Sequence, residues 1–113
     1  MRLCRYAGAN HRGHNGRRAP LALTNTALVV DRRAITGLSH DFDSLPPMPL
    51  GMHCPKDDGS SIVAHFSYSN GRHQVPVAVS LTGCRSVSNG YISGITSTTA
   101  AGNDLLRRLN QLV

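Results

Sequence analysis

A β-hairpin is predicted by residues 54–84, CPKDDGSSIVAHFSYSNGRHQVPVAVSLTGC. Apolar side chains occupy alternate positions in residues 62–68 and again in residues 75–81, which is the two-residue period of a strand with one buried face. Asn70-Gly71 lies between the two runs and marks a turn. All the alternating apolar side chains share one face when the arms pair about this turn, which sets three pairs opposite each other: Ile62 and Val79, Ala64 and Val77, Phe66 and Val75.

Pro76 sets the length of the turn. With a two-residue loop, position 76 would have to donate its backbone N–H to the partner strand, and proline has no N–H. A four-residue loop, residues 69–72, keeps the same face assignment and turns the Pro76 nitrogen outward. We therefore expect the longer loop, with a sheet edge at least near Pro76.

Two of the three cysteines flank this hairpin. The predicted register brings Cys84 close to Asp57, which places Cys54 within reach for a disulfide. A bridge that closes a loop of about 30 residues is worth roughly 3 kcal/mol, and such bridges are typical of oxidising compartments. The alternative is two buried, reduced thiols, because sequence alone does not fix connectivity. Cys4 is the odd cysteine in either case.

The chain before the hairpin predicts two strands and a helix. In order, we expect a strand over residues 2–7, a mobile loop rich in Gly, Asn, Arg and His over residues 8–20, and a strand over residues 27–30. Asp31 is a suitable N-cap for a helix over residues 31–45, which the following two prolines end. Its apolar face consists of residues at three- and four-residue steps: Ile35, Leu38, Phe42 and Leu45.

The chain after the hairpin predicts one more strand and one more helix. In order, we expect a turn over residues 85–90, a short strand over residues 91–95 and a linker over residues 96–102. Asn103 is a suitable cap for a helix over residues 103–112, whose leucines fall on one side. The sequence therefore predicts a single α+β domain over residues 1–113. It combines a small antiparallel sheet of about four strands, the 31–45 helix packed on one face, and the C-terminal helix closing an edge.

The positive charge of the chain lies in its first third. The chain has twelve Arg and Lys residues and six Asp residues, which gives a net charge of +6. Residues 1–33 alone contain seven Arg and one Asp. A solvated, Arg-rich surface without a partner is the more ordinary explanation. The alternative is an anion- or nucleic-acid-binding module that uses Arg2, Arg5, Arg12, Arg17 and Arg18. No aromatic residues alternate with these arginines and no zinc-finger or helix-turn-helix pattern is present, so nucleic acid is not the expected partner.

Histidines and cysteines near the N-terminus have the element types of a zinc site without its spacing. Cys4, His11 and His14 form a C-x6-H-x2-H pattern, which His53 or Cys54 would have to complete. This spacing matches no standard structural zinc site. Solvated loop histidines are the simpler explanation, and no metal site is predicted.

No catalytic centre is predicted either. Asp57-Asp58-Gly59 resembles part of a calcium loop but lacks the spaced oxygen ligands and the distal Glu of an EF-hand, so a tight turn before the strand is favoured. His65 lies on the strand face opposite the apolar side chains. His65 could act as a general base, but the sequence shows no nucleophile and no orienting acid that would complete a catalytic site with it. We therefore expect a non-catalytic protein without a cofactor.

Several motifs together cover nearly the whole chain: CRYAGAN (4–10), VVDRRAITGL (29–38), LPPMP (45–49), CPKDDGSS (54–61), FSYSNGR (66–72) and VSLTGCRSVSNG (79–90). They resemble a domain of uncharacterised secreted proteins and lipoproteins of actinobacteria, and the CP-x-D-D-G and G-C-R-x-V-x-N-G pair is the most specific part. The resemblance implies export, an oxidised Cys54–Cys84 bridge and a small α+β domain outside the membrane. It also implies that Cys4, which lies in the matching CRY motif, is intrinsic to the domain and not a lipid-attachment site.

The expected function is binding outside the cytoplasm. No apolar run is long enough to span a membrane, and Met1 is followed by a polar sequence. An export leader is therefore expected to have been removed or to lie outside this chain. We expect an extracellular or envelope-associated domain that binds an unidentified protein or cell-envelope partner.

Overall fold

The predicted hairpin forms the centre of the sheet in the computed structural model, which describes residues 1–8, 22–68, 73–91 and 93–113. Strands β3 (Ser61–Tyr68) and β4 (His73–Ser80) pair antiparallel. The expected partners face each other: Ile62 and Val79, Ala64 and Val77, Phe66 and Val75. The strands are joined by residues 69–72, the length that Pro76 predicts, and these connecting residues lie outside the described ranges.

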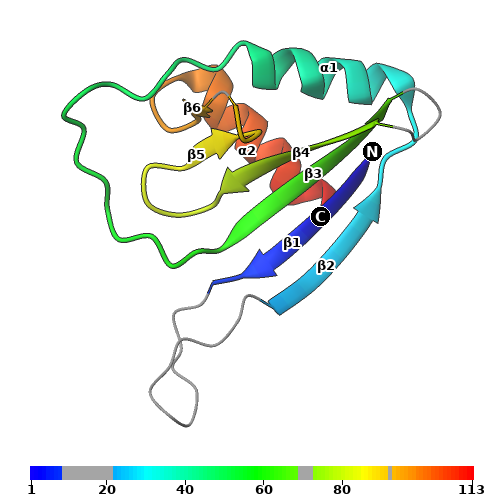
Figure 1. Cartoon of the computed structure of the whole chain (residues 1–113), viewed down its shortest axis with the longest axis horizontal. Coiled ribbons are helices and arrows are strands. Elements are labelled where there is room, and N and C mark those ends of the chain that lie inside the picture. The colour runs from blue at the N-terminus through cyan, green and yellow to red at the C-terminus, as the bar shows by residue number, and fades with distance from the viewer. Residues whose placement is uncertain (9–21, 69–72, 92) are drawn as a thin grey trace, which may run out of the picture.

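Six antiparallel strands form the sheet, in the order β2-β1-β3-β4-β5-β6 (Figure 1). The other four are β1 (Arg2–Ala7), β2 (Ala22–Leu28), β5 (Ser86–Ser88) and β6 (Ser93–Ile95). The prediction of about four strands was too low. Strand β6 lies within the short strand expected over residues 91–95, whereas β5 has only three residues and is too short to show a hydrophobic period. The segment expected as a turn, residues 85–90, contains β5.

The two edges of the sheet explain why the start of β2 was predicted wrongly and why the predicted edge at Pro76 is confirmed. Strand β2 begins at Ala22 and not at Ala27, and nearly all its side chains are exposed, so it has no buried face that would produce an alternating pattern. Strand β5 pairs with only Ala78 and Val79 of β4. The segment around Pro76 therefore lies on an open edge, as its missing N–H predicts.

Both helices, α1 (Arg32–Asp43) and α2 (Ala100–Leu112), cover the same face of the sheet. Figure 1 shows α2 crossing behind β3 and β4. The buried core joins the two layers and consists of Leu3, Leu38, Ile62, Ala64, Phe66, Val77, Val79, Val87, Leu105, Leu106 and Leu109. The prediction that the C-terminal helix closes an edge was wrong, because its buried leucines make it part of the helical layer that covers the sheet face.

Helix α1 begins and packs as its sequence predicts. The Asp31 carboxylate accepts a hydrogen bond of 3.1 Å from the backbone N–H of Arg33, which makes Asp31 the N-cap. Leu38 is buried, and the ring of Phe42 meets the ring of Phe66 edge to face, with 6.0 Å between their centroids. The helix ends at Asp43, before the two prolines.

Helix α2 begins three residues earlier than predicted, at Ala100. Its N-cap is Thr99, whose hydroxyl accepts a hydrogen bond of 3.0 Å from the backbone N–H of Gly102. Asn103, the predicted cap, instead donates from its side chain to the Thr99 carbonyl. The prediction failed because residues 96–102 have the small, polar composition of a linker. A Cβ at Gly102 would lie 2.5 Å from the Thr96 carbonyl oxygen, so glycine is required where α2 meets the preceding turn.

Candidate functional site

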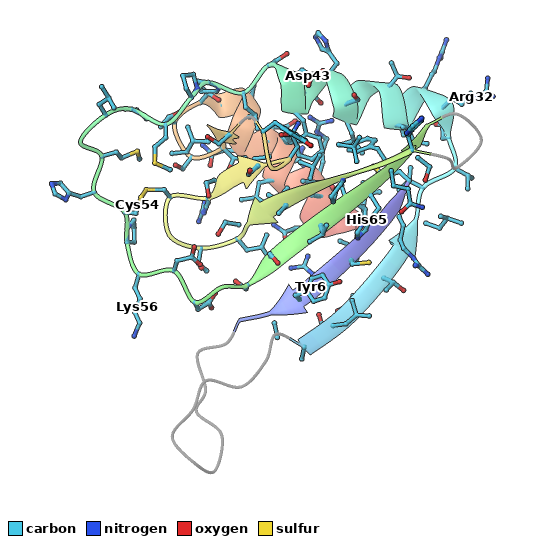
Figure 2. The ribbon with its side chains drawn as sticks, viewed as in Figure 1. Tyr6, Arg32, Asp43, Cys54, Lys56 and His65 are labelled. Carbon is cyan, nitrogen blue, oxygen red and sulfur yellow. A yellow bond between two sulfur atoms is a disulfide. The ribbon has the colours of Figure 1, made fainter. Side chains whose placement is uncertain are left out.

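A disulfide joins the long connection between α1 and β3 to the turn between β4 and β5. Cys54 and Cys84 form this bridge with 4.9 Å between their Cα atoms, which confirms the pairing predicted from the hairpin. Cys84 is buried, whereas Cys54 is exposed. Figure 2 shows Cys54 and Lys56 in the loop on the left of the view, far from Arg32 and His65 on the right.

Beside the disulfide, side chains from both segments form a hydrogen-bonded network that we call the polar clasp: Asp57, Asp58, Ser60, Ser80 and Thr82. The Asp57 carboxylate accepts hydrogen bonds from the Gly59 backbone N–H at 2.8 Å, the Thr82 hydroxyl at 2.9 Å and the Ser80 hydroxyl at 3.0 Å. The Asp58 carboxylate accepts from the Ser60 hydroxyl and backbone N–H and from Thr82. The segment is thus the tight turn that its sequence favours, fastened to the neighbouring turn.

Hydrogen bonds lower the pKa of both carboxyl groups in the polar clasp. The Gly59 N–H has the largest effect on the pKa of Asp57, and the Ser60 hydroxyl has the largest effect on the pKa of Asp58. The oxygens of both carboxylates accept hydrogen bonds from N–H and hydroxyl groups of the protein, and these bonds favour the ionised form. Within the described ranges, no three His, Cys, Asp or Glu side chains gather as a metal site requires.

Residues 46–54 form a loop that is fixed at both ends, and we call it the pinned loop. At its start the Pro46 carbonyl accepts a hydrogen bond of 3.0 Å from the backbone N–H of Ile95, and at its end Cys54 is held by the disulfide. Between these points Met48 is 39% exposed and the Leu50 side chain is fully exposed. A loop with fixed ends and an apolar tip is a suitable shape for contact with another molecule.

A small cleft of about 120 Å³ opens next to the start of the pinned loop. Apolar side chains from α1, the adjoining Leu45 and the sheet form one part of its wall, and polar residues form the other part. The lining residues are Phe42, Asp43, Leu45, Val77, Val87, Asn89, Ser93 and Gly94. A Cβ at Gly94 would lie 3.0 Å from the Leu45 Cβ. The cleft is large enough for one apolar side chain of a partner and too small for most cofactors.

The arginines predicted to bind anions are not brought together by the described part of the chain. Arg2 and Arg5 are three residues apart on β1, so they point to opposite faces of the sheet. Arg5 lies on the helix side, where it donates to the Asn110 side-chain oxygen at 2.7 Å and to the Val113 carbonyl at 3.4 Å. The remaining members, Arg12, Arg17 and Arg18, and the predicted mobile loop after Gly8 lie outside the described residues.

His65 and Cys4 lie on the face of the sheet that the helices leave uncovered. His65 is half-buried between Arg2 of β1 and Pro76 of β4, and it does not line the cleft beside Leu45. Cys4 is a buried free thiol. Of the zinc ligands considered from the sequence, Cys54 is in the disulfide, and His11 and His14 fall outside the described ranges.

Sequence reasoning missed a second group of polar side chains, on the outer side of α2. Arg85, from the turn after the disulfide, faces a groove shared with Arg107 and three amide side chains of α2. Arg85 is more than fifteen positions away from the α2 residues in the sequence, and the group follows no known motif, so only the packing of α2 against the 81–85 turn reveals it.

No protein-family model, curated protein sequence or solved structure matches the chain. The resemblance to secreted actinobacterial domains therefore stays a prediction from the sequence motifs. Neither of the two helices that the structure describes has the length and hydrophobicity needed to cross a bilayer.

Proposed function

We propose that the chain is a non-catalytic domain that functions outside the cytoplasm and binds a protein of the cell envelope through the pinned loop. The single observation that carries this proposal is the fully exposed Leu50 in a loop fixed by the Cys54–Cys84 disulfide. Leucine is disfavoured at such a position in the free protein and is stabilised when a partner removes it from water.

The disulfide supports both the location and the binding role. Disulfides form and persist in oxidising compartments, which are outside the cytoplasm in most organisms. A loop with fixed ends also loses less conformational entropy on binding than a free segment does, so more of the contact energy contributes to affinity. The cleft beside Leu45 extends the apolar contact surface next to the pinned loop.

The alternative function, an anion-binding module made by the arginines of the first third, receives no support from the described part of that set. Arg2 and Arg5 lie on opposite faces of the sheet, and Arg5 is already engaged at the end of α2. Separated charges of this kind do not form one binding surface.

Site-specific photo-crosslinking in the native host tests the proposal. A photoreactive residue at position 50 should give one discrete protein adduct, and the same residue at the exposed position Thr24 on β2 should not. The adduct should weaken in the C54S/C84S variant, because the loop loses one of its two fixed ends. Equal adduct patterns at positions 50 and 24, or turnover of a hydrolase substrate panel by the purified protein, would contradict the proposal.

A further inference from the structure

The outer side of α2 and the turn of residues 81–85 enclose a shallow groove of about 410 Å³. Its lining combines two guanidinium groups, three carboxamides and an apolar floor: Arg85, Arg107, Asn103, Asn110, Gln111, Leu81 and Leu106. None of these seven residues is acidic and none is aromatic. The groove is separate from the pinned loop and from the predicted set of N-terminal arginines, apart from Arg5 at its end.

Arg85 is held in an unfavourable backbone conformation at the edge of this groove. Its φ angle is +55°, in the left-handed region where glycine or asparagine is usual. Two hydrogen bonds to its carbonyl fix this geometry, from the Thr96 backbone N–H at 3.1 Å and from the Thr96 hydroxyl at 2.9 Å. A non-glycine residue in this region costs about 1 kcal/mol or more, and such strain is concentrated at functional sites.

The charges around the groove are predominantly positive. No ion pair or hydrogen bond engages the Arg85 guanidinium among the residues that the structure describes, and the side chain is exposed. Arg107 pairs with Asp104, which does not line the groove, and keeps further N–H donors free. Arg5 adds a third guanidinium at one end, where it donates to Asn110.

We propose that this groove binds oxyanion groups of a linear anionic glycan. Guanidinium groups match the paired oxygens of carboxylate and phosphate, and carboxamides donate to and accept from sugar hydroxyls. The groove follows α2 from Asn103 to Asn110, a rise of about 10 Å, so it is long enough for more than one saccharide unit. The shared chemistry is an oxyanion on a glycan, supplied by either a carboxylate or a phosphate. Single-stranded nucleic acid is less favoured because the lining has no aromatic ring on which bases stack.

Calorimetric titration of the purified chain tests the proposal with defined oligomers. The probes are an oligogalacturonate for carboxylate, a glycerol phosphate oligomer for phosphate, a neutral maltooligosaccharide of matched length, and an oligo-dT. At least one of the two anionic probes should bind and the neutral probe should not, and the one that binds identifies the oxyanion. Affinity should fall when NaCl is raised, because salt screens the charges.

Variants separate binding from folding. Arg85→Asn keeps a residue that tolerates the left-handed conformation, so thermal stability should be retained or raised while affinity falls about tenfold or more. Arg107→Gln should lower affinity by a similar factor. The matched control is Arg2→Gln, an exposed arginine on the opposite face of the sheet, which should leave binding unchanged.

Four results would overturn the proposal: no binding of either anionic oligomer at millimolar concentration, equal binding of the neutral oligomer, equal loss of affinity in Arg2→Gln, or unchanged affinity in both groove variants. Tighter binding of oligo-dT than of both glycan probes, with loss in Arg85→Asn, would reassign the groove to nucleic acid.

Discussion

In the hairpin core, Ile62 and Val79 are fully buried beneath two helices, whereas in the polar clasp the side chains of Asp57 and Ser80 are joined near the surface by hydrogen bonds. The two regions belong to the same hairpin and are continuous along β4. One is held together by apolar burial, which depends little on pH or redox state. The other is held by a disulfide and by ionised carboxylates, and each of these depends on the surroundings.

This difference indicates that the two regions have separate structural roles. The core fixes the sheet and places the ends of the strands. The disulfide and the polar clasp then fasten an irregular connection, including the pinned loop, onto that scaffold. Substitutions in the two regions should therefore differ in their dependence on reducing agent and pH.

The largest effect is expected for Phe66→Ala. Phe66 is 4% exposed and packs edge to face on Phe42, so its truncation should lower the free energy of unfolding by about 3–5 kcal/mol. Urea denaturation of the oxidised protein measures the loss. Phe66→Leu is the control and should lose much less. A loss below about 1 kcal/mol in the alanine variant would show that this face of the hairpin is not the core.

Removal of the disulfide in the C54S/C84S variant should have the next largest effect, about 3 kcal/mol for the loop closed by a sequence separation of 30. Thermal melts with and without a thiol reductant measure it. The reductant should lower the melting temperature of the wild type and leave that of the variant unchanged. The same response to reductant in both proteins would contradict a stabilising role for the bridge.

A smaller effect is expected for Thr82→Val. The Thr82 hydroxyl accepts from the Asp58 backbone N–H at 3.1 Å and contacts both clasp carboxylates at 2.9 Å. Its loss should cost about 1–2 kcal/mol, because polar groups lose a partner. Thr26→Val on the exposed strand β2 is the control and should change stability little. Equal effects of the two substitutions would show that the polar clasp does not stabilise the fold.

The smallest effect is a change of stability with pH. The pKa values of Asp57 and Asp58 are lowered by hydrogen bonds in the folded state, so the unfolded chain binds protons more tightly. Their contribution is therefore complete above about pH 4, the pKa of an unperturbed Asp. It is lost as the pH falls through the lower folded-state values. Urea denaturation between pH 2 and pH 7 should show this slope, and Thr82→Val should reduce it. An identical pH dependence of stability in wild type and variant would contradict a contribution from the clasp carboxylates.

Elements with a regular burial pattern could be predicted from the sequence. The hairpin register follows from the alternation that ends in Phe66 and Val75, and the start of α1 follows from Asp31 as a cap. The missed elements lack such patterns. Strand β5 has three residues, β2 is exposed almost throughout, and the first turn of α2 contains Gly102, a residue that sequence rules assign to linkers.

The candidate sites were predicted less completely than the fold. The disulfide could be inferred because Cys54 and Cys84 flank a hairpin with a defined register. The exposure of Leu50 could not be inferred, because an isolated apolar residue in a proline-rich segment belongs to no periodic pattern that would assign it to a buried or an exposed face. The groove at Arg85 depends on a positive φ angle and on contacts between distant segments, neither of which is encoded in a local pattern.

Peptide mapping by non-reducing mass spectrometry, on protein taken from its native host, shows whether the Cys54–Cys84 disulfide fixes the pinned loop. We expect one linked pair of peptides that contains Cys54 and Cys84, with Cys4 recovered as a free thiol after denaturation. Recovery of Cys54 and Cys84 as free thiols would contradict both the fixed end of the pinned loop and the oxidising compartment that the proposed function requires.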